Sequence, residues 1–318
     1  MKRIAQTLLS FLLLATIVTV IAGFAGAAHP VFDTASNFRL HLAVGLLILA
    51  ALLAMTGARR QAITGAVVAM AGIAGCWQGL PVGQEAPPPS GNVHTAFVMN
   101  LLWDNREQDK VLSLIARHDP DIVLLSEVSR HWSANLAKLE TLYPFHYHCA
   151  EWRSLGGNVI LSRMKLKKAG FCGPYASLGL ATFEMDGFDI DVGVVHLRWP
   201  WPASGPRQIT AITPKLQQTG PDALIAGDFN SVTWSHSLQR FAQAGNLEIV
   251  GGIGATWGPG HHARDRSYWF PAVLGLPIDN VMAKGKVKVV SAQRLGRSGS
   301  DHLPILVKFT VENEPVGK

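Results

Sequence analysis

The sequence predicts an α+β fold, a four-layer α/β/β/α sandwich in which helices flank two packed mixed sheets, preceded by about three transmembrane helices. One observation is a shortage of charge: charged residues make up 16% of the chain, against roughly a quarter in soluble domains. The shortage is confined to the N-terminal part, where long stretches carry no charged residue. The other observation is that, from His94 onward, strand-like apolar runs alternate with segments whose apolar residues recur at helical spacing. Many strands with a few interspersed helices favour two packed sheets flanked by helices.

Three N-terminal stretches are predicted to span a membrane, because each approaches the roughly 20 apolar residues that a helix needs to cross the hydrocarbon core. They cover residues 4–28, 41–58 and 61–80, and the third is rich in Gly and Ala. For the first stretch the alternative is a cleaved signal peptide that ends at the small residues 25–27. For the third the alternative is a buried or interfacial helix. We interpret residues 1–80 as a multi-pass anchor in the lipid bilayer of the inner or plasma membrane.

The basic residues near the span ends predict the orientation, since Lys and Arg stay on the cytoplasmic side. Lys2 and Arg3 precede the first span, and Arg59 and Arg60 lie between the second and the third. Both pairs stay in the cytoplasm if the chain crosses three times, so the domain that follows is expected to be extracytoplasmic. Losing the third span would reverse this orientation.

The prolines of residues 81–92 predict a linker, because proline cannot continue a helix. We expect one folded domain over residues 93–311 and a short tail over residues 312–318. Strands are expected at 94–100, 119–128, 157–162, 179–185, 188–196, 222–227, 286–292 and 303–310. Helices are expected at 106–118, 129–140, 206–218 and 234–243.

Polar residues end or open the predicted strands, where burying them is costly unless they are paired or bind a metal. Singly, an Asp or Asn after a strand is usually a turn former or a helix cap, and a lone His is more often a hydrogen-bonded edge residue. Together they predict one cleft lined by oxygen ligands and imidazoles, and oxygen ligands without cysteine favour Mg²⁺ or Mn²⁺. They are Asn100, Glu127, His196, Asp228, Asn230, Asp279, Asp301 and His302.

The motifs that carry these residues resemble, in wording and order, the endonuclease/exonuclease/phosphatase superfamily. This superfamily includes deoxyribonuclease I, AP endonucleases, neutral sphingomyelinases and inositol polyphosphate 5-phosphatases. The motifs are NLLWDN, PDIVLLSEV, GGNVILSR, VVHL, GDFNS, PID and GSDHLPI, and they span nearly all of residues 95–308. GDFN followed by a late SDHLPI is specific. The spans before the domain resemble a bacterial membrane-anchored subgroup, and the resemblance implies that residues 93–311 are the catalytic domain.

The resemblance implies a bound Mg²⁺ or Mn²⁺. Asn100 and Glu127 match the metal-binding pair near the start of the domain, with Glu127 as the principal ligand. Asp301 matches the acid beside the essential histidine, and we assign it to the metal as well. Such a metal would neutralise charge on the phosphoryl oxygens and stabilise the leaving oxygen.

The resemblance also implies which residues act on the phosphate. Asp228 and Asn230 match the pair that orients the attacking water and holds the phosphate, and His196 matches a histidine that contacts it. His302 matches the essential histidine near the C-terminus, and Asp279 matches the carboxylate that orients His302. The expected reaction is in-line attack by water, with either Asp228 or His302 and its acid partner as the base.

Substrate binding is assigned to Asn158, in GGNVILSR, and to two loops crowded with Trp, Arg and His. These loops are residues 198–207, which end at Arg207, and residues 257–270, which begin at Trp257. They fit two interpretations equally: surfaces that stack on bases or grasp lipid headgroups, or surface loops that pack on themselves.

The chain departs from the family pattern at two positions. Ser126 stands where Gln often precedes the metal-binding Glu, and Asn280 stands where His or Tyr is common. We find no match for the active-site tyrosine of AP endonucleases, which argues against abasic-site repair.

The function that we expect is hydrolysis of a phosphodiester by a membrane-anchored, divalent-metal-dependent phosphoesterase. Nucleic acid and lipid or small phosphodiesters stay rival substrates, since a net charge of +6 is mild for a nucleic-acid binder. The alternative is a catalytically silent, membrane-tethered binding module of the same fold, but such modules typically lose site residues. No obligate protein partner is evident.

The cysteines lack the CxxC spacing of a structural zinc site. Cys76 lies in an apolar run and is expected to be buried. Cys149 and Cys172 could form one disulfide in an oxidising compartment. The sequence leaves this open, because it does not give the distance between their Cα atoms.

Overall fold

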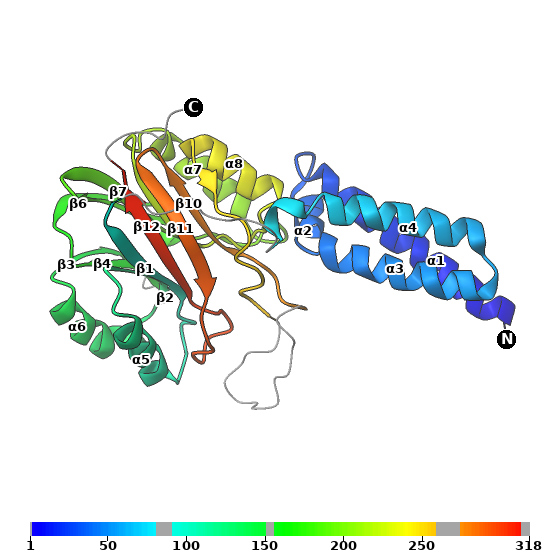
Figure 1. Cartoon of the computed structure of the whole chain (residues 1–318), viewed down its shortest axis with the longest axis horizontal. Coiled ribbons are helices and arrows are strands. Elements are labelled where there is room, and N and C mark those ends of the chain that lie inside the picture. The colour runs from blue at the N-terminus through cyan, green and yellow to red at the C-terminus, as the bar shows by residue number, and fades with distance from the viewer. Residues whose placement is uncertain (1, 81–90, 151–155, 259–273, 313–318) are drawn as a thin grey trace.

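The computed structural model describes residues 2–80, 91–150, 156–258 and 274–312. It has two parts, a group of N-terminal helices and a sandwich of two sheets with helices on both outer faces (Figure 1). Both sheets are mixed, so the predicted architecture of the sandwich is confirmed.

The first sheet, within the described residues, has six strands in the order β11-β12-β1-β2-β4-β3. β1 and β2 are parallel, and the other neighbours are antiparallel. β2 is buried along its whole length, as expected for a strand with both faces covered. The strands are Val93–Asn100 (β1), Ile122–Val128 (β2), Phe145–Cys149 (β3), Gly157–Ser162 (β4), Val287–Arg294 (β11) and Ile305–Val311 (β12).

The second sheet, counted over the same ranges, also has six strands, in the order β5-β6-β7-β8-β10-β9. β7 and β8 are parallel, and the other neighbours are antiparallel. The strands are Leu166–Cys172 (β5), Leu178–Met185 (β6), Phe188–His196 (β7), Ala223–Asp228 (β8), Glu248–Ile249 (β9) and Asp279–Lys284 (β10).

Apolar layers hold the sandwich together. The inner faces of the two sheets pack through residues such as Val98, Leu124 and Val192. α5 and α6 cover the first sheet, and α7 and α8 cover the second. These helices have one apolar face, which a period of 3.6 residues turns toward the sheet. The helices are Gln108–His118 (α5), Ser133–Leu142 (α6), Gly205–Leu216 (α7) and His236–Gly245 (α8), with 3-10 turns at Arg130–Trp132 (η3) and Pro174–Ala176 (η4).

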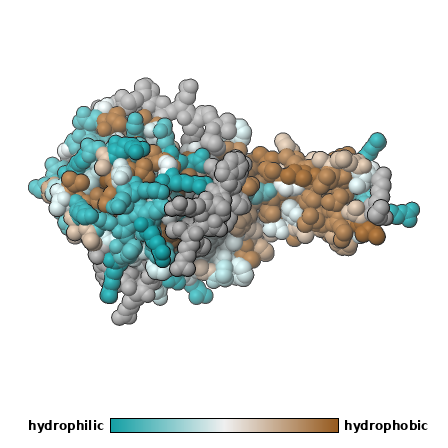
Figure 2. Space-filling model, turned by 90° about the horizontal axis from the view of Figure 1, so that it is seen from below, coloured by the Kyte–Doolittle hydropathy of each residue, from teal (hydrophilic) through white to brown (hydrophobic). Residues whose placement is uncertain are grey.

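Two N-terminal helices are long and apolar enough to cross a membrane. α1 (Lys2–Ala22) runs into the 3-10 turn η1 (Gly23–Ala25), and α3 covers Arg39–Thr56. The candidate spans are Arg3–Ala25 and Arg39–Thr56. Figure 2 shows that the hydrophobic surface of this part extends away from the more hydrophilic sandwich.

The third predicted span, residues 61–80, is not among the candidate spans, because the helix there is the shorter α4 (Arg59–Ala74). This helix has 16 residues, and at 1.5 Å per residue it is about 24 Å long, short of the roughly 30 Å hydrocarbon core. It ends at Ala74, with Gly75 as its C-cap, and is followed by the 3-10 turn η2 (Trp77–Gly79). The described residues therefore contain two candidate spans, and α4 packs beside them.

A further helix, α2 (Pro30–Asn37), lies between α1 and α3, at the junction with the sandwich (Figure 1). The sequence did not predict it, because it is short and its stability comes from contacts made far along the chain.

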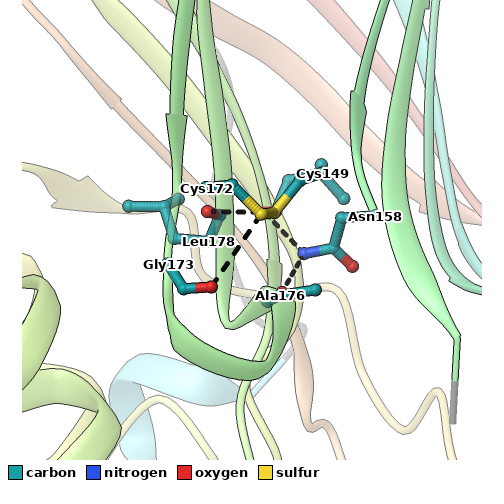
Figure 3. The surroundings of a disulfide bond; sticks show 7 residues. Cys149, Asn158, Cys172, Gly173, Ala176 and Leu178 are labelled. Atoms are coloured by element: carbon teal, nitrogen blue, oxygen red, sulfur yellow. Dashed lines mark hydrogen bonds between the residues drawn. A yellow bond between two sulfur atoms is a disulfide. The ribbon is translucent and has the colours of Figure 1, made fainter. Parts of the chain in front are cut away.

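Cys149 and Cys172 form a disulfide, the pairing that the sequence left open. Cys149 lies on β3 and Cys172 on β5, so the bond joins the edge strands of the two sheets (Figure 3). Cys76 is a buried free cysteine, as expected.

Several predicted segments lie outside the described residues. They include most of the predicted linker, all but the first residue of the predicted tail, and most of the loop at 257–270.

Candidate active site

Strand register places three of the predicted residues side by side on the second sheet. His196, at the end of β7, pairs with Asp228 at the end of β8, and Asp228 pairs with Asp279 at the start of β10. Gly227 precedes Asp228 with a φ of +143°, and a Cβ there would lie 2.2 Å from the Val195 carbonyl oxygen. The glycine therefore allows the close approach of β7 and β8 that brings these side chains together.

Glu127 lies in a β-bulge of β2. Leu125 pairs with Val159 and Val128 with Gly157, so β2 carries one residue more than β4 over this stretch. Glu127 has a φ of +56°, a conformation that costs energy for any residue other than glycine. A bulge re-aims a side chain, and this one directs the carboxylate toward Asn100 on the neighbouring strand.

Asn100 connects the carboxylates of the two sheets. Its Nδ2 donates to Glu127 Oε1 at 3.0 Å and to Asp228 Oδ2 at 3.1 Å. Its Oδ1 accepts from the Leu102 amide at 3.0 Å, and Glu127 Oε2 accepts from the Trp103 amide at 3.0 Å. Asn100, Glu127 and Asp228 are all buried, so two carboxylates are held close together away from water.

Both histidines direct an Nε2 atom at these carboxylates. His302 Nε2 lies 3.6 Å from Asp228 Oδ2, while its Nδ1 is 2.7 Å from Asp279 Oδ2. His196 Nε2 lies 3.5 Å from Glu127 Oε1 and 3.8 Å from Asp228 Oδ2. A phosphate at this point would meet two imidazoles and two carboxylates.

Burial and neighbouring charges shift the pKa values of the central pair. Burial disfavours the charged form of His302, but Asp279 and Asp228 outweigh it and raise the pKa of the imidazole to about 10. Burial, together with Asp279, raises the pKa of Asp228 to about 6, against the opposing effect of His302 and His196. His302 therefore holds two protons at neutral pH, and the negative charge of Asp228 is poorly solvated.

Asn230 occupies a strained turn directly after Asp228. Its φ is +48°, and its amide N–H donates to Asp228 Oδ1 at 2.8 Å. Its Nδ2 donates to the Leu197 carbonyl oxygen at 2.8 Å and to Asp228 Oδ2 at 3.2 Å. The turn thus orients both Asn230 and Asp228 at the site.

Trp257 lies beside Asp301 and His302. Its Nε1 donates to Asp301 Oδ2 at 3.0 Å, and its backbone forms a bridge with His302. Trp199 packs edge-on against it with ring centroids 5.8 Å apart. Trp257 therefore orients the Asp301 carboxylate, and the roles predicted for Trp257 in substrate binding and for Asp301 in metal binding stay predictions.

Two other predicted substrate residues have different surroundings. Asn158 is 1% exposed, and its Nδ2 donates to the backbone oxygens of Ala176 and Val194, beside the disulfide (Figure 3). Arg207 is exposed in the first turn of α7. Neither makes a hydrogen bond or ion pair with the residues around Asn100 in the part of the chain that the structure describes, and their roles also stay predictions.

The donor set suits a hard divalent cation. Ligand atoms of Asp228, Asp279 and His302 lie within 4.8 Å of one another, and Asn100 connects Asp228 to Glu127. Burial, and to a lesser degree repulsion from Asp279, disfavours the charged form of Asp228, and its raised pKa records that cost. A cation bound among these oxygens would relieve it.

Two positioning residues escaped the sequence analysis. Ser300 Oγ donates to the Asn100 carbonyl oxygen at 2.8 Å and accepts from the His302 amide at 3.0 Å. Thr256 Oγ1 accepts from the Asp279 amide at 3.2 Å. Ser300 lies inside the motif GSDHLPI, so it could have been predicted from the motif. Thr256 belongs to no motif, so nothing in the sequence marks it.

The sequence pattern described as the Endonuclease/Exonuclease/phosphatase family matches residues 98–302. This range begins near the end of β1 and ends at His302, so it contains all eight polar residues that were predicted at the strand ends. No curated protein matches the chain in sequence.

Three solved structures illustrate the similarity of the fold. TDP2 from D. rerio, complexed with a single strand DNA product, has a TM-score of 0.54 at 15% identity, over 69% of this chain and 99% of that one. The human Nocturnin catalytic domain has a TM-score of 0.53 at 18% identity, over 71% and 97% of the two chains. Beta toxin from Staphylococcus aureus has a TM-score of 0.53 at 15% identity, over 67% and 99%.

Proposed function

The chain belongs to the endonuclease/exonuclease/phosphatase family, and on that premise we propose that it is a membrane-anchored, divalent-metal-dependent phosphodiesterase. The catalytic domain in this proposal is residues 93–311. The members of this family hydrolyse phosphodiesters or phosphate esters, and the chain has their fold.

The observation that carries the proposal is the convergence of residues from both sheets on one buried point. Asn100 and Glu127 come from the first sheet, and His196 and Asp228 from the second. Burying several carboxylates and imidazoles together costs free energy and is retained where they act on a ligand. A binding module without activity would have no need for this whole set.

The metal would be held by Glu127 with Asn100, and by Asp301 as the third predicted ligand. When bound, it would neutralise charge on the phosphoryl oxygens. Glu127 and Asn100 already meet in the structure, since Glu127 Oε1 accepts from Asn100 Nδ2 at 3.0 Å.

The chain's own residues supply the proton transfers in this mechanism. Asp279 holds His302 Nδ1, which leaves the Nε2–H of the imidazolium free to donate to a phosphoryl or leaving oxygen. Asp228 is the group that accepts a proton from the attacking water, and Asn230 orients the same carboxylate through two hydrogen bonds. His196 donates to a phosphoryl oxygen beside Glu127.

The substrate is a phosphodiester, and two classes fit. The relative from D. rerio holds a single strand DNA product, which supports nucleic acid. The apolar N-terminal helices support a phosphodiester of the lipid type, because they would keep the enzyme at a bilayer.

We also propose that the catalytic domain is extracytoplasmic. The Cys149–Cys172 disulfide supports this, since disulfides persist in oxidising compartments. Arg59 and Arg60 between α3 and α4 support a cytoplasmic turn there. This orientation requires that α4, which packs beside α3 and α1, returns the chain to the outer side, and that return is part of the proposal. In this orientation, alkaline phosphatase fused after residue 318 should be active. An inactive phosphatase fusion, together with fluorescence from a reporter that fluoresces only in the cytoplasm and is fused at the same position, would show that the domain is cytoplasmic.

The experiment uses the full chain in detergent with Mg²⁺ or Mn²⁺. The substrates are single- and double-stranded DNA, RNA, sphingomyelin, an inositol phosphate and bis-p-nitrophenyl phosphate. Glu127→Gln and His302→Ala should each lose roughly 100-fold or more of the turnover. Glu248→Gln and His131→Ala, both at exposed positions, are matched controls and should retain it.

The outcomes separate the two functions. Metal-dependent turnover that both site variants lose supports the hydrolase, and the best substrate names its class. A folded chain that binds no Mn²⁺ and cleaves nothing would instead favour the catalytically silent binding module.

A further inference from the structure

The helix α2 brings polar residues of the anchor into buried contact with the sandwich. Asp33, Ser36 and Asn37 are each 1% exposed. They lie in a short connection between two apolar helices, where polar side chains would ordinarily face water. Buried polar groups are retained where they have partners. The Ser36 hydroxyl donates to the Asp33 carbonyl oxygen nearby, but the side chains of Asp33 and Asn37 and the carbonyl oxygen of Ser36 have partners about 200 residues further along the chain.

Asp33 caps a helix of the sandwich. Its Oδ1 accepts from the His236 amide at 2.7 Å, and its Oδ2 accepts from the Ser237 amide at 2.9 Å and from the Ser237 hydroxyl. These amides open α8, whose N-terminus carries a partial positive charge that a carboxylate stabilises. Ser235 is the local cap of the same helix. The carboxylate from the anchor therefore fixes α2 at one defined place on the domain.

From this place Asn37 reaches the turn that follows Asp228. Its Nδ2 donates to the Asn230 carbonyl oxygen, and its Oδ1 accepts from the Val232 amide, both at 3.2 Å. Both ends of its amide are thus bound to one turn. Trp234, just after this turn, donates through Nε1 to the Ser36 carbonyl oxygen at 2.8 Å.

α2 also contacts the loop that follows His196. Thr34 Oγ1 donates to the Trp201 carbonyl oxygen at 3.1 Å and accepts from its amide at 2.9 Å. The rings of Phe38 and Trp199 are stacked with centroids 6.2 Å apart. The anchor therefore touches the segments that follow two of the strands that carry site residues, β7 and β8.

We propose that α2 is a positioning element of the active site and that Asn37 is its positioning residue. The turn at Asn230 is strained and needs surrounding contacts to persist. Within the domain, the Leu197 carbonyl oxygen accepts a hydrogen bond from Asn230 Nδ2. From the N-terminal helices, Asn37 Nδ2 donates a hydrogen bond to the carbonyl oxygen of the same residue. Docking of α2 thus couples the anchor to the geometry of Asp228 and Asn230. This inference rests on the proposed phosphodiesterase function.

The test uses the full chain in detergent, with bis-p-nitrophenyl phosphate and Mn²⁺. Asn37→Ala removes both hydrogen bonds to the turn and should lower kcat roughly 10- to 100-fold, because small displacements of catalytic groups cost that much. KM should change by no more than about twofold, since the loss is in the transition state.

Thr34→Ala is the matched control. It removes a contact of the same helix that does not reach the Asn230 turn, and its kcat should stay within about twofold of wild type. Wild-type kcat in Asn37→Ala would overturn the proposal. An equal loss of kcat in Thr34→Ala and Asn37→Ala would overturn it too, because the effect would then come from weaker packing of α2 as a whole and not from the Asn230 turn.

Hydrogen exchange resolved to single amides provides a readout that does not depend on turnover. The Val232 amide should exchange faster in Asn37→Ala simply because its partner is gone. The Asn230 amide is bonded to Asp228, so faster exchange there reports that the site itself has moved. If wild type cleaves nothing, the proposed function fails, and unchanged exchange at Asn230 in Asn37→Ala would separately overturn the positioning role.

Discussion

At the scale of single residues, the hydrogen bond between Asp279 and His302 decides how the imidazole is used. With Nδ1 bound to Asp279 at 2.7 Å, the ring can present only Nε2 to Asp228 and to a substrate. A neutral amide in place of the carboxylate would keep the volume but lose the charge that stabilises the imidazolium.

We therefore expect Asp279→Asn to lower kcat by roughly 100-fold or more, with little change in KM. Steady-state kinetics on the best substrate would measure this. Asp189→Asn, at an exposed position, is the matched control and should behave as wild type. An Asp279→Asn enzyme that loses less than about threefold would show that orientation of His302 does not limit the reaction.

The pKa shifts predict a pH dependence of stability in the metal-free protein. The pKa of Asp228 rises on folding from 3.8 to about 6, so its contribution is complete below pH 3.8 and is lost as the pH rises through about 6. The pKa of His302 rises from 6.5 to about 10, so its contribution is complete below pH 6.5 and is lost toward pH 10. Both shifts make rising pH destabilising.

Thermal unfolding in EDTA, from pH 6.5 to 10, would measure the contribution of His302 to the pH dependence of the unfolding free energy. The slope of the unfolding free energy should approach about 1.4 kcal/mol per pH unit at most, the limit for one proton. His302→Asn should remove this slope. Equal slopes in wild type and His302→Asn would mean that Asp279 and Asp228 do not hold the imidazolium.

At the scale of elements, most strands and helices were predictable because their patterns are local. β4 and β7 match the predicted ranges 157–162 and 188–196, and α5 begins two residues inside the predicted 106–118. β5 was missed because five of its seven residues are exposed and none is buried, so no alternation marks it. β3 was missed because FHYHC alternates aromatic residues with histidine over only five positions.

The bulge at Glu127 is an element-scale feature that the sequence marks only through a glycine. Gly156 has a φ of +100°, and a Cβ there would lie 2.7 Å from the Val128 carbonyl carbon and 2.9 Å from that of Glu127. GGNVILSR contains this glycine, but the sequence gives no sign that it packs against β2. Strand register, which is set by the whole sheet, supplies that information.

Gly156→Ala should therefore both destabilise the protein and displace Glu127. We expect a loss of about 2 to 4 kcal/mol of unfolding free energy, from left-handed strain and from the clash, together with weaker Mn²⁺ binding. Gly187→Ala is the matched control, because Gly187 has a φ of +84° and nothing within 4 Å of its Cβ position. It should cost only about 1 kcal/mol and leave Mn²⁺ affinity unchanged; calorimetric titration and thermal unfolding measure the two effects. Equal Mn²⁺ affinities in both variants would show that Gly156 does not affect metal binding at the site.

At the scale of the whole molecule, the sequence predicted the strand-end residues but not the partner that completes their surroundings. Asn100, Glu127 and Asp228 could be found because motifs mark them. Asn37 could not, because its contacts with Asn230 and Val232 join segments almost 200 residues apart. Docking of α2 is a property of the folded chain, and no periodicity or motif within residues 30–37 encodes it.

If the N-terminal helices lie in a bilayer, the same docking sets the distance of the proposed active site from it. Exposed aromatic residues gather where the anchor meets the sandwich, including Phe24, Phe38, Trp77 and Trp201, which are 52%, 40%, 60% and 49% exposed. Aromatic side chains prefer the headgroup level of a membrane. If α1 and α3 span the bilayer, the segments after His196 and Asp228 lie against its surface, because they are the segments that α2 contacts.

A phosphodiester presented by a bilayer should then be a better substrate than the same headgroup in solution. The full chain in vesicles would be compared on a long-chain phosphodiester lipid and on its water-soluble short-chain analogue, with a single-stranded oligonucleotide beside them. We expect a kcat/KM at least roughly 10-fold higher for the bilayer lipid, since the anchor holds the site at the surface and raises the local substrate concentration. Trp201→Ala should reduce this preference, while Leu142→Ala, at a position 60% exposed on α6, should not. Faster cleavage of the oligonucleotide would assign the site to nucleic acid, and equal rates on the two lipids would show that the junction does not direct the site toward the membrane.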